Sequence, residues 1–307
     1  MDPLSDVLSL VKIRHYRSGG LETGGDWCVE FGRYEGVRFY AVVFGECWLS
    51  VEGIPEQRLV ETGDCVLFPN GRSFRVGSDL ALAPVAALTI FPSVSDGSIT
   101  TYNGGGDFLA ICGHFTIAGD QADILLGLLP PTFHIREESD KAVLRWTLER
   151  MQQELRDPQP GGFLVGQQLA TMVLVQVLRL YLGEVANGVG WLFALADKRI
   201  GVAITAMHKD PAHRWTIQSL AECAGMSRTA FAVKFKETVG KSPMDYLTHW
   251  RMLLAGDRLA NSGAPISVIA PSLGYESDSA FSTAFKRVMG CSPRQYSRSC
   301  EPTLTVR

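Results

Sequence analysis

The chain has 307 residues, of which 46% are hydrophobic and 20% are charged. That length suits two domains, and this share of apolar side chains excludes a chain that is disordered throughout. The formal charge of −3 conceals an asymmetry, because the segment from Asp197 onward carries 15 Lys or Arg against 9 Asp or Glu and the rest of the chain is acidic. A basic C-terminal part is typical of a protein that contacts phosphate.

Short runs of β-branched and aromatic residues, separated by glycine and proline turns, occupy the first hundred positions. Such runs, closely spaced, predict a small all-β barrel or sandwich. The clearest of them lie at 38–43, 47–51, 65–68 and 74–76.

After Pro130-Pro131 the apolar residues recur at three- and four-residue steps, which predicts helices. The second of these helices, about 163–183, is apolar on nearly every side, so we expect it to be enclosed. Two partners remain open: its own domain, or a second subunit in a homodimer. Its charge-free stretch, 163–178, is shorter than the roughly 20 apolar residues of a membrane span, so no membrane association is expected.

Thiol content and the N-terminus favour a cytoplasmic protein. The seven cysteines include no C-x-x-C pair, which suits reduced thiols better than disulfides or structural zinc. Met1–Leu10 lacks a basic segment followed by an apolar run, so it does not resemble a signal peptide.

The C-terminal third contains one unit twice, at 215–246 and 264–296. The offset is 49 residues before the turn and 50 after it, so the second copy has one extra turn residue. Each copy predicts a helix, a glycine turn and a second helix, which is a helix-turn-helix. The matched positions are Ile217 and Ile266, Ala221 and Ala270, Gly225 and Gly274, Phe231 and Phe281, Phe235 and Phe285, Lys236 and Lys286, Gly240 and Gly290, Ser242 and Ser292, Pro243 and Pro293, and Tyr246 and Tyr296.

Capping residues fix the ends of these helices. Thr216 is an N-cap for a helix to about Ala224, and Ser227 caps the next, at 228–239. Ser277 or Asp278 takes the same role in the second copy. In a helix-turn-helix the second helix enters the major groove, so its outward side chains meet DNA. The expected base-reading residues are Arg228, Thr229, Ala232, Val233, Ser279, Ser282 and Thr283, and the expected phosphate contacts are Lys236, Lys286, Arg287 and Arg294.

Residues 197–298 resemble the DNA-binding domain of AraC-type transcription regulators. The resemblance rests on LAECAGMSRTAFAVKFKETVGKSPMDYL at 220–247 and GYESDSAFSTAFKRVMGCSPRQY at 274–296. It implies seven helices with two helix-turn-helix units joined by a long helix. It also implies binding to promoter DNA, often as a dimer, to activate or repress transcription by recruiting or blocking RNA polymerase.

Two features depart from that family pattern. Members commonly carry Arg where this chain has Val233 and Thr283, so specificity is expected to rest on thymine-methyl contacts, hydroxyl groups and DNA shape. Pro271 falls inside the first helix of the second unit, where a proline removes a hydrogen bond and is expected to bend the helix.

The segment from Gly63 to Phe74 resembles the second motif of cupin barrels, G-x5-P-x-G-x2-H, with Phe74 in place of the His. No His lies between Tyr16 and Leu109, so the imidazole ligands of a metal-binding cupin are missing. We expect His15, His114 and His134 to be structural or exposed, and we expect no metal and no cofactor.

A metal-free barrel indicates either a pocket for a small organic effector or a domain that serves dimer contacts alone. The residues predicted to line a pocket are Tyr40, Trp48, Phe68, Arg72 and Phe74. Alternatively, these aromatic side chains fill the interior of a small barrel.

The sequence thus predicts an α+β multidomain chain. Its expected parts are a cupin-like β-barrel sensor at 1–135, a helical linker or dimerisation segment at 136–190, and an all-α domain with two helix-turn-helix units at 197–298. The predicted function is sequence-specific regulation of transcription, without enzyme activity. The alternatives are a cupin metalloenzyme with an appended DNA domain, which the missing His ligands disfavour, a repair regulator with a methyl-accepting cysteine, and a structural DNA-bending protein.

Overall fold

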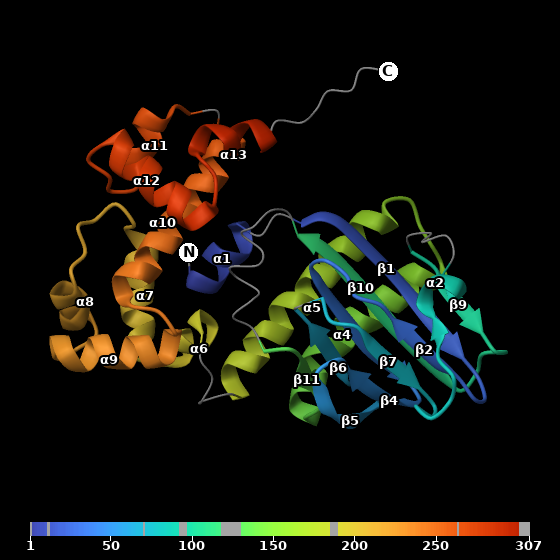
Figure 1. Ribbon diagram of the computed structural model, residues 1–307. Coiled ribbons are helices and arrows are strands. Elements are labelled where there is room, and N and C mark those ends of the chain that lie inside the picture. Colours follow the sequence, from blue (N-terminus) through green and yellow to red (C-terminus); the bar gives the residue numbers. More distant parts are fainter. Residues whose placement is uncertain are drawn as a thin grey trace, which may run out of the picture. The chain divides into compact units, whose positions relative to one another are not determined.

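The computed structural model describes residues 2–10, 13–69, 71–91, 97–117, 130–184, 190–262 and 264–300 (Figure 1). The chain divides into two compact units. We call Lys12–Glu184 the sheet unit, and Met1–Val11 together with Val185–Arg307 the helical unit.

The sheet unit contains two β-sheets, as the alternating strand pattern predicts. Neighbouring strands pair antiparallel except β1 with β9 and β2 with β8, which pair parallel. The larger sheet has the order β11 (Phe133–Ile135), β6 (Cys65–Phe68), β3 (Val37–Phe44), β10 (Phe108–Ile117), β1 (Ile13–Thr23) and β9 (Ile99–Tyr102). The smaller has the order β5 (Ile54–Glu61), β4 (Glu46–Val51), β7 (Phe74–Gly77), β2 (Cys28–Phe31) and β8 (Val85–Ala86).

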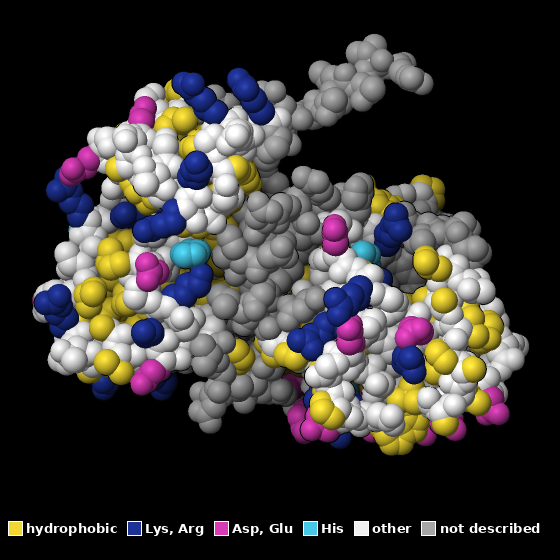
Figure 2. Space-filling view, viewed as in Figure 1, with side chains coloured by type: hydrophobic (Ala, Val, Ile, Leu, Met, Phe, Trp, Pro, Cys, Tyr) yellow, Lys and Arg dark blue, Asp and Glu magenta, His cyan; other side chains and the backbone are white. Residues whose placement is uncertain are grey.

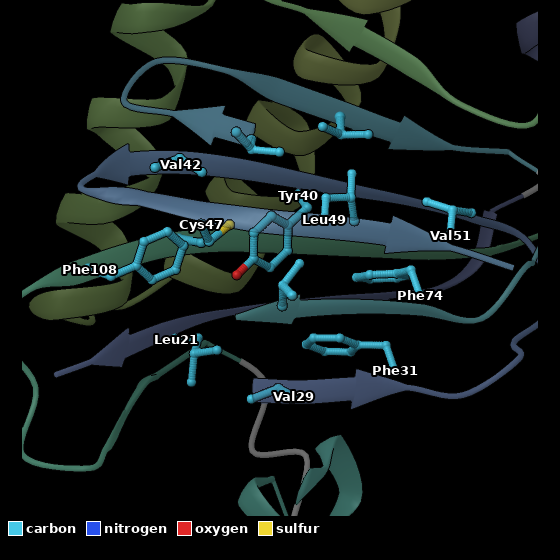
Figure 3. Close-up of a cluster of buried hydrophobic side chains, with 14 of the residues drawn as sticks. Leu21, Val29, Phe31, Tyr40, Val42, Cys47, Leu49, Val51, Phe74 and Phe108 are labelled. Atoms are coloured by element: carbon cyan, nitrogen blue, oxygen red, sulfur yellow. The ribbon is translucent and has the colours of Figure 1, made fainter. Parts of the chain in front are cut away.

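Aromatic side chains fill the core of this unit (Figure 3). Phe74 stacks on Phe68 with ring centroids 4.3 Å apart and on Phe31 at 4.7 Å. Tyr40 meets Phe74 edge-on at 6.3 Å. Because these rings come from both sheets, their contacts hold the sheets together.

Two long helices, α4 (Glu138–Arg156) and α5 (Gly162–Glu184), pack against each other, and α5 also packs against strands β1, β6 and β11. The sequence boundaries set 136–190 apart as a linker, whereas the structure includes α4 and α5 in the compact sheet unit. Within α5, Gly162–Leu180 is long and apolar enough to cross a membrane, judged by length and composition among the described residues. A helix that packs its inward side against a sheet, as α5 does, meets the same criteria.

A buried carboxylate fastens this helical layer to the larger sheet. Asp64 lies at the turn between β5 and β6 and is 2% exposed. It accepts a hydrogen bond from His134 Nε2 at 2.8 Å and pairs with Lys141 Nζ at 2.9 Å. Burial opposes ionisation, but the bonds from His134 and Lys141 outweigh it and hold the pKa of Asp64 below its ordinary value.

The helical unit contains a central helix with two helix pairs connected to it. The central helix is α10 (Pro243–Asn261), which separates the pair α8 (Ile217–Cys223) and α9 (Arg228–Val239) from the pair α11 (Ile266–Ser272) and α12 (Asp278–Met289). The remaining helices in the described part of this unit are α1 (Pro3–Leu10), α6 (Trp191–Ala196), α7 (Ile200–Lys209) and α13 (Pro293–Cys300).

Helix α1 packs on α7 and α10, although it precedes the sheet unit in the chain (Figure 1). Val7 is 2% exposed, and Asp6 Oδ2 lies 3.6 Å from His208 Nδ1. The His208 ring stacks on Trp250 with centroids 3.8 Å apart, and its Nε2 lies 2.8 Å from the Tyr246 hydroxyl. The sequence boundaries assigned residues 1–135 to one domain, whereas the structure groups the first eleven with the helical unit.

Candidate nucleic-acid interface and effector cavity

The capping residues set the helix starts as the sequence predicts. The Thr216 hydroxyl accepts from the Ser219 amide at 3.0 Å, and the Ser219 hydroxyl accepts from the Thr216 amide at 3.0 Å, which completes a capping box. Ser227 and Ser277 cap α9 and α12, each accepting from the amide three residues on. Both helices end at a left-handed glycine, Gly240 and Gly290.

Helices α9 and α12 expose the same positions over their twelve residues. In each, the inward face carries two phenylalanines four residues apart, Phe231 with Phe235 and Phe281 with Phe285, all 0% exposed. Because the inward phenylalanines occupy equivalent positions, the outward positions of the two helices also correspond. Thr229 of α9 is equivalent to Ser279 of α12, and the other positions follow in the same order. The chain therefore presents two helices of equal length with equivalent outward faces.

The residues predicted to read bases lie on these outward faces. Arg228, Thr229, Ser279 and Thr283 are exposed, and Val233 is 52% exposed. Ala232 and Ser282, which occupy equivalent positions, are less exposed than these residues and are half-buried at the edge of each outward face. The Thr283 hydroxyl donates to the Ser279 carbonyl of its own helix at 3.0 Å.

The residues predicted to contact phosphate, Lys236, Lys286, Arg287 and Arg294, are all exposed. None of them forms an ion pair within the described part of the chain. Figure 2 shows Lys and Arg side chains distributed over the visible face of the helical unit.

Other basic residues of this unit are already engaged. Lys234 Nζ lies 2.6 Å from Asp197 Oδ2, which ties α9 to the segment that leads into α7. Arg251 donates to the Pro211 and His213 carbonyls at 2.7 and 2.9 Å and thereby fixes the loop between α7 and α8. Lys234 and Arg251 therefore stabilise the fold, and the sequence alone does not distinguish them from the basic residues without an ion pair.

Pro271 lies in the last turn of α11, which has seven residues like α8. Near the end of so short a helix the proline disturbs little that follows, and the next residues make a turn in which the Tyr275 amide bonds to the Ala270 carbonyl at 3.0 Å. The first unit has the same closure, from the Met226 amide to the Ala221 carbonyl at 2.9 Å. The second turn therefore closes in the same way as the first despite the proline.

The structure separates the five predicted pocket residues into three that are packed in the core and two that lie at the surface. Tyr40, Phe68 and Phe74 are at most 2% exposed and belong to the core of the sheet unit. Trp48 is 41% exposed, and Arg72 donates to the Glu52 carbonyl at 3.0 Å on the surface. Three of these aromatic side chains therefore fill the interior, as the alternative interpretation expects.

A cavity of about 270 Å³ lies elsewhere in the sheet unit. Its walls come from five strands or strand-flanking segments and from helix α2 (Ala87–Ile90). No local sequence pattern marks this cavity, because its wall residues are spread over almost a hundred positions. They are Arg17, Ser18, Gly19, Gly20, Phe31, Arg38, Ala87, Leu88, Phe91, Ser98, Thr100, Cys112 and His114.

Two of the three early histidines have described partners. His134 binds Asp64, and His114 Nε2 donates to the Glu35 carbonyl at 2.7 Å. The side chain of His15 lies outside the described residues. Among the residues that the structure describes, no group of three His, Cys, Asp or Glu is arranged to hold a metal ion.

Comparison with known proteins matches both units. The chain matches a family model described as Cupin over residues 2–183 and one described as Helix-turn-helix domain over residues 220–299. It is 41% identical to an AraC-like transcription regulator of Streptomyces antibioticus, over 98% of this chain and all of that protein. A regulator of the same description from Streptomyces lividans is also 41% identical, over 99% of this chain and all of that protein. Among solved structures, the DNA-binding domain of AdpA in complex with a target DNA is 28% identical, covers 35% of this chain and 98% of its own, and gives a TM-score of 0.32.

Proposed function

Because the chain belongs to the family of AraC-type transcription regulators, we propose that it binds promoter DNA through α9 and α12. The observation that carries the proposal is the equivalence of these helices. They have the same length, the same kinds of cap, inward phenylalanines at the same positions and the same pattern of exposed and buried positions. Two equivalent helices on one helical unit suit two successive major grooves of a duplex.

The base-reading roles follow from side-chain chemistry. Arg228 at the first turn of α9 suits the O6 and N7 acceptors of guanine, while Thr229, Ser279, Ser282 and Thr283 offer hydroxyl groups. Ala232 and Val233 suit the methyl group of thymine. The exposed apolar side chain of Val233 is consistent with this role.

The phosphate contacts supply affinity without sequence preference. Lys236 and Lys286 occupy equivalent positions in the two helices, and Arg287 and Arg294 extend the basic surface of the second unit. Since none is held in an ion pair within the described residues, each can approach a phosphate without first losing a partner.

The sheet unit would control DNA binding through a small organic effector and through homodimerisation. Exposed apolar side chains on α4 and α5 support a protein contact there. A bound dimer would recruit or block RNA polymerase, and such a regulator acts in the cytoplasm. The apolar side chains concerned are Val143, Trp146, Phe163, Leu164, Val165 and Met172, between 40% and 63% exposed.

Selection of bound sequences from random duplex DNA by the full chain tests the proposal. We expect a defined motif, with two half-sites about one helical turn apart within each protomer's footprint. Recovery of no motif above the background of bulk polyanion binding would contradict it.

Single substitutions then separate the two kinds of contact. Lys286→Ala should weaken binding to all duplexes and reduce the slope of log affinity against log salt by about 0.9, because one phosphate contact is lost. Thr229→Ala should change the selected motif and leave that slope unchanged. Arg136→Ala is the control, because it removes the same charge from an exposed position of the sheet unit outside the proposed dimer contact.

A further inference from the structure

The cavity of the sheet unit places basic side chains in one row across three strands. The strand register sets Arg38 of β3 opposite His114 of β10, and His114 opposite Arg17 of β1. Residues opposite one another in paired strands project on the same side of a sheet, and adjacent strands lie about 4.8 Å apart. The backbone positions of Arg38 and Arg17 therefore lie about 10 Å apart, and His114 lies on the strand between them.

No carboxylate balances this row within the described part of the chain. Arg38 and Arg17 form no ion pair there. The Arg38 guanidinium lies 4.2 Å from the centroid of the Tyr34 ring and 5.4 Å from that of Phe31. Arg38 is half-buried, and this burial lowers the pKa of its guanidinium.

The neighbouring histidine responds to this excess of positive charge. Burial lowers the pKa of His114, and the charges of Arg38 and Arg17 lower it further, against the opposing effect of the Glu35 carbonyl. Aromatic faces stabilise a guanidinium, but they leave its in-plane N–H groups without acceptors. An anion with two acceptor oxygens would fill that role.

The opposite wall of the cavity is apolar. Phe31, Ala87, Leu88 and Phe91 contribute it, and Leu88 is 79% exposed at the rim. Gly19 lies opposite Cys112 in the register, next to the basic row, and both residues line the cavity. A volume of about 270 Å³ lies near the lower end of the usual range for ligand pockets, so it suits a compact molecule.

We propose that this cavity binds a small carboxylate with a compact apolar body, and that such a carboxylate is the effector of the regulator. The carboxylate would lie between Arg38 and Arg17, and the apolar body would lie against Phe31, Leu88 and Phe91. A planar carboxylate fits the bidentate donor pattern of a guanidinium, and the apolar wall excludes a bare inorganic anion as the best ligand. The regulatory part of this inference rests on the proposed function of the chain, whereas binding in the cavity does not.

Calorimetric titration of the full chain, without DNA, tests the binding step. The probes are phenylacetate, hexanoate and the neutral isostere phenylacetamide, with inorganic phosphate as a fourth ligand. We expect both carboxylates to bind, with phenylacetamide and inorganic phosphate at least about tenfold weaker than phenylacetate. Equal affinity for phenylacetate and phenylacetamide would overturn the proposal, as would the absence of binding by both carboxylates up to about 10 mM.

A pair of arginine variants identifies the site. Arg38→Met keeps an unbranched side chain and removes the charge, so phenylacetate should bind at least about tenfold more weakly. Arg72→Met is the matched control, because Arg72 lies outside this cavity although the sequence suggested it for a pocket. Weaker binding by the Arg72 variant alone would refute the assignment.

A second pair of variants covers the case in which Arg38→Met does not fold. Leu88 is exposed, so Leu88→Glu and Leu88→Gln should both fold. The glutamate places a negative charge at the rim and should weaken phenylacetate binding severalfold more than the glutamine does. Equal affinities for these two variants would count against an anion in the cavity.

Motif selection and calorimetry separate the two levels of the inference. If the full chain selects a DNA motif but binds neither carboxylate, the cavity proposal fails and the DNA-binding function stands. If phenylacetate binds in an Arg38-dependent manner and does not change the affinity for the selected motif, the effector role is refuted and the binding site stands.

Discussion

Alanine substitution of the two turn glycines, one at a time, distinguishes backbone conformation from close packing. Gly225 and Gly274 are equivalent residues of the two helix-turn-helix units, with φ angles of +61° and +79°. A Cβ atom at Gly225 would meet nothing within 4 Å. At Gly274 it would lie 2.5 Å from the Ala212 carbonyl oxygen and 2.9 Å from a nitrogen of Arg251.

The expected losses of stability follow from these surroundings. A left-handed conformation costs an alanine about 1–2 kcal/mol, and the reduced freedom of the unfolded chain returns about 0.4–1 kcal/mol, so Gly225→Ala should lose about 1 kcal/mol. Gly274→Ala carries the same cost and must also displace a backbone carbonyl, which adds about 1–3 kcal/mol of overpacking strain. The difference of about 2 kcal/mol corresponds to roughly a thirtyfold change in the unfolding equilibrium.

Hydrogen exchange of the full-length variants, followed by mass spectrometry over a series of urea concentrations, measures this difference within the helical unit. Peptides from α11, α12 and α13 should lose protection in Gly274→Ala well below the urea concentration that affects Gly225→Ala. The loop between α7 and α8 should also lose protection in Gly274→Ala, because Ala212 lies there and Arg251 binds its neighbours. Equal losses in the two variants, or a larger loss at Gly225, would refute the argument from packing.

Three further predictions concern buried groups. Asp64→Asn should lower the free energy of unfolding at pH 7 by about 3 kcal/mol, because it removes a buried charge that pairs with Lys141. In urea titrations the difference from the wild type should narrow as the pH falls below about 4, because the unfolded chain then takes up a proton on Asp64 that the folded chain, with its lowered pKa, does not yet bind. Burial lowers the pKa of His208 to about 3, so below about pH 6.5 the unfolded chain takes up a proton that the folded chain does not bind. The free energy of unfolding therefore falls on acidification, and His208→Phe should reduce that fall by about 1.4 kcal/mol per pH unit. An unchanged dependence of the free energy of unfolding on pH would contradict this. Val7→Ala should lower the free energy of unfolding of the helical unit by about 2 kcal/mol, since Val7 is buried. Ser9→Ala, on the exposed side of α1, should change it little. If the two variants have equal effects on hydrogen exchange in α7 and α10, the packing of α1 on those helices is refuted.

The sequence was sufficient wherever the signal is local. The N-caps Thr216, Ser227 and Ser277 lie where the capping pattern predicts, because a cap depends on a side chain and an amide only three residues away. The inward direction of Phe231 and Phe235 follows from the helical repeat alone. Since the helix-turn-helix units are built from such short-range relations, their positions and outward faces could be predicted from the chain.

Tertiary structure decided the relations between residues far apart. Arg17, Arg38 and His114 form one row because strand register pairs His114 with residues 76 and 97 positions earlier in the chain, and no local periodicity encodes that register. The same limit explains why Phe68 and Phe74 were predicted to line a pocket and are instead packed in the core: alternation shows that two residues share a face, but not whether a cavity or another ring lies in front of them. The docking of α1 on the helical unit is likewise determined by contacts across nearly the whole chain, which only the folded protein defines.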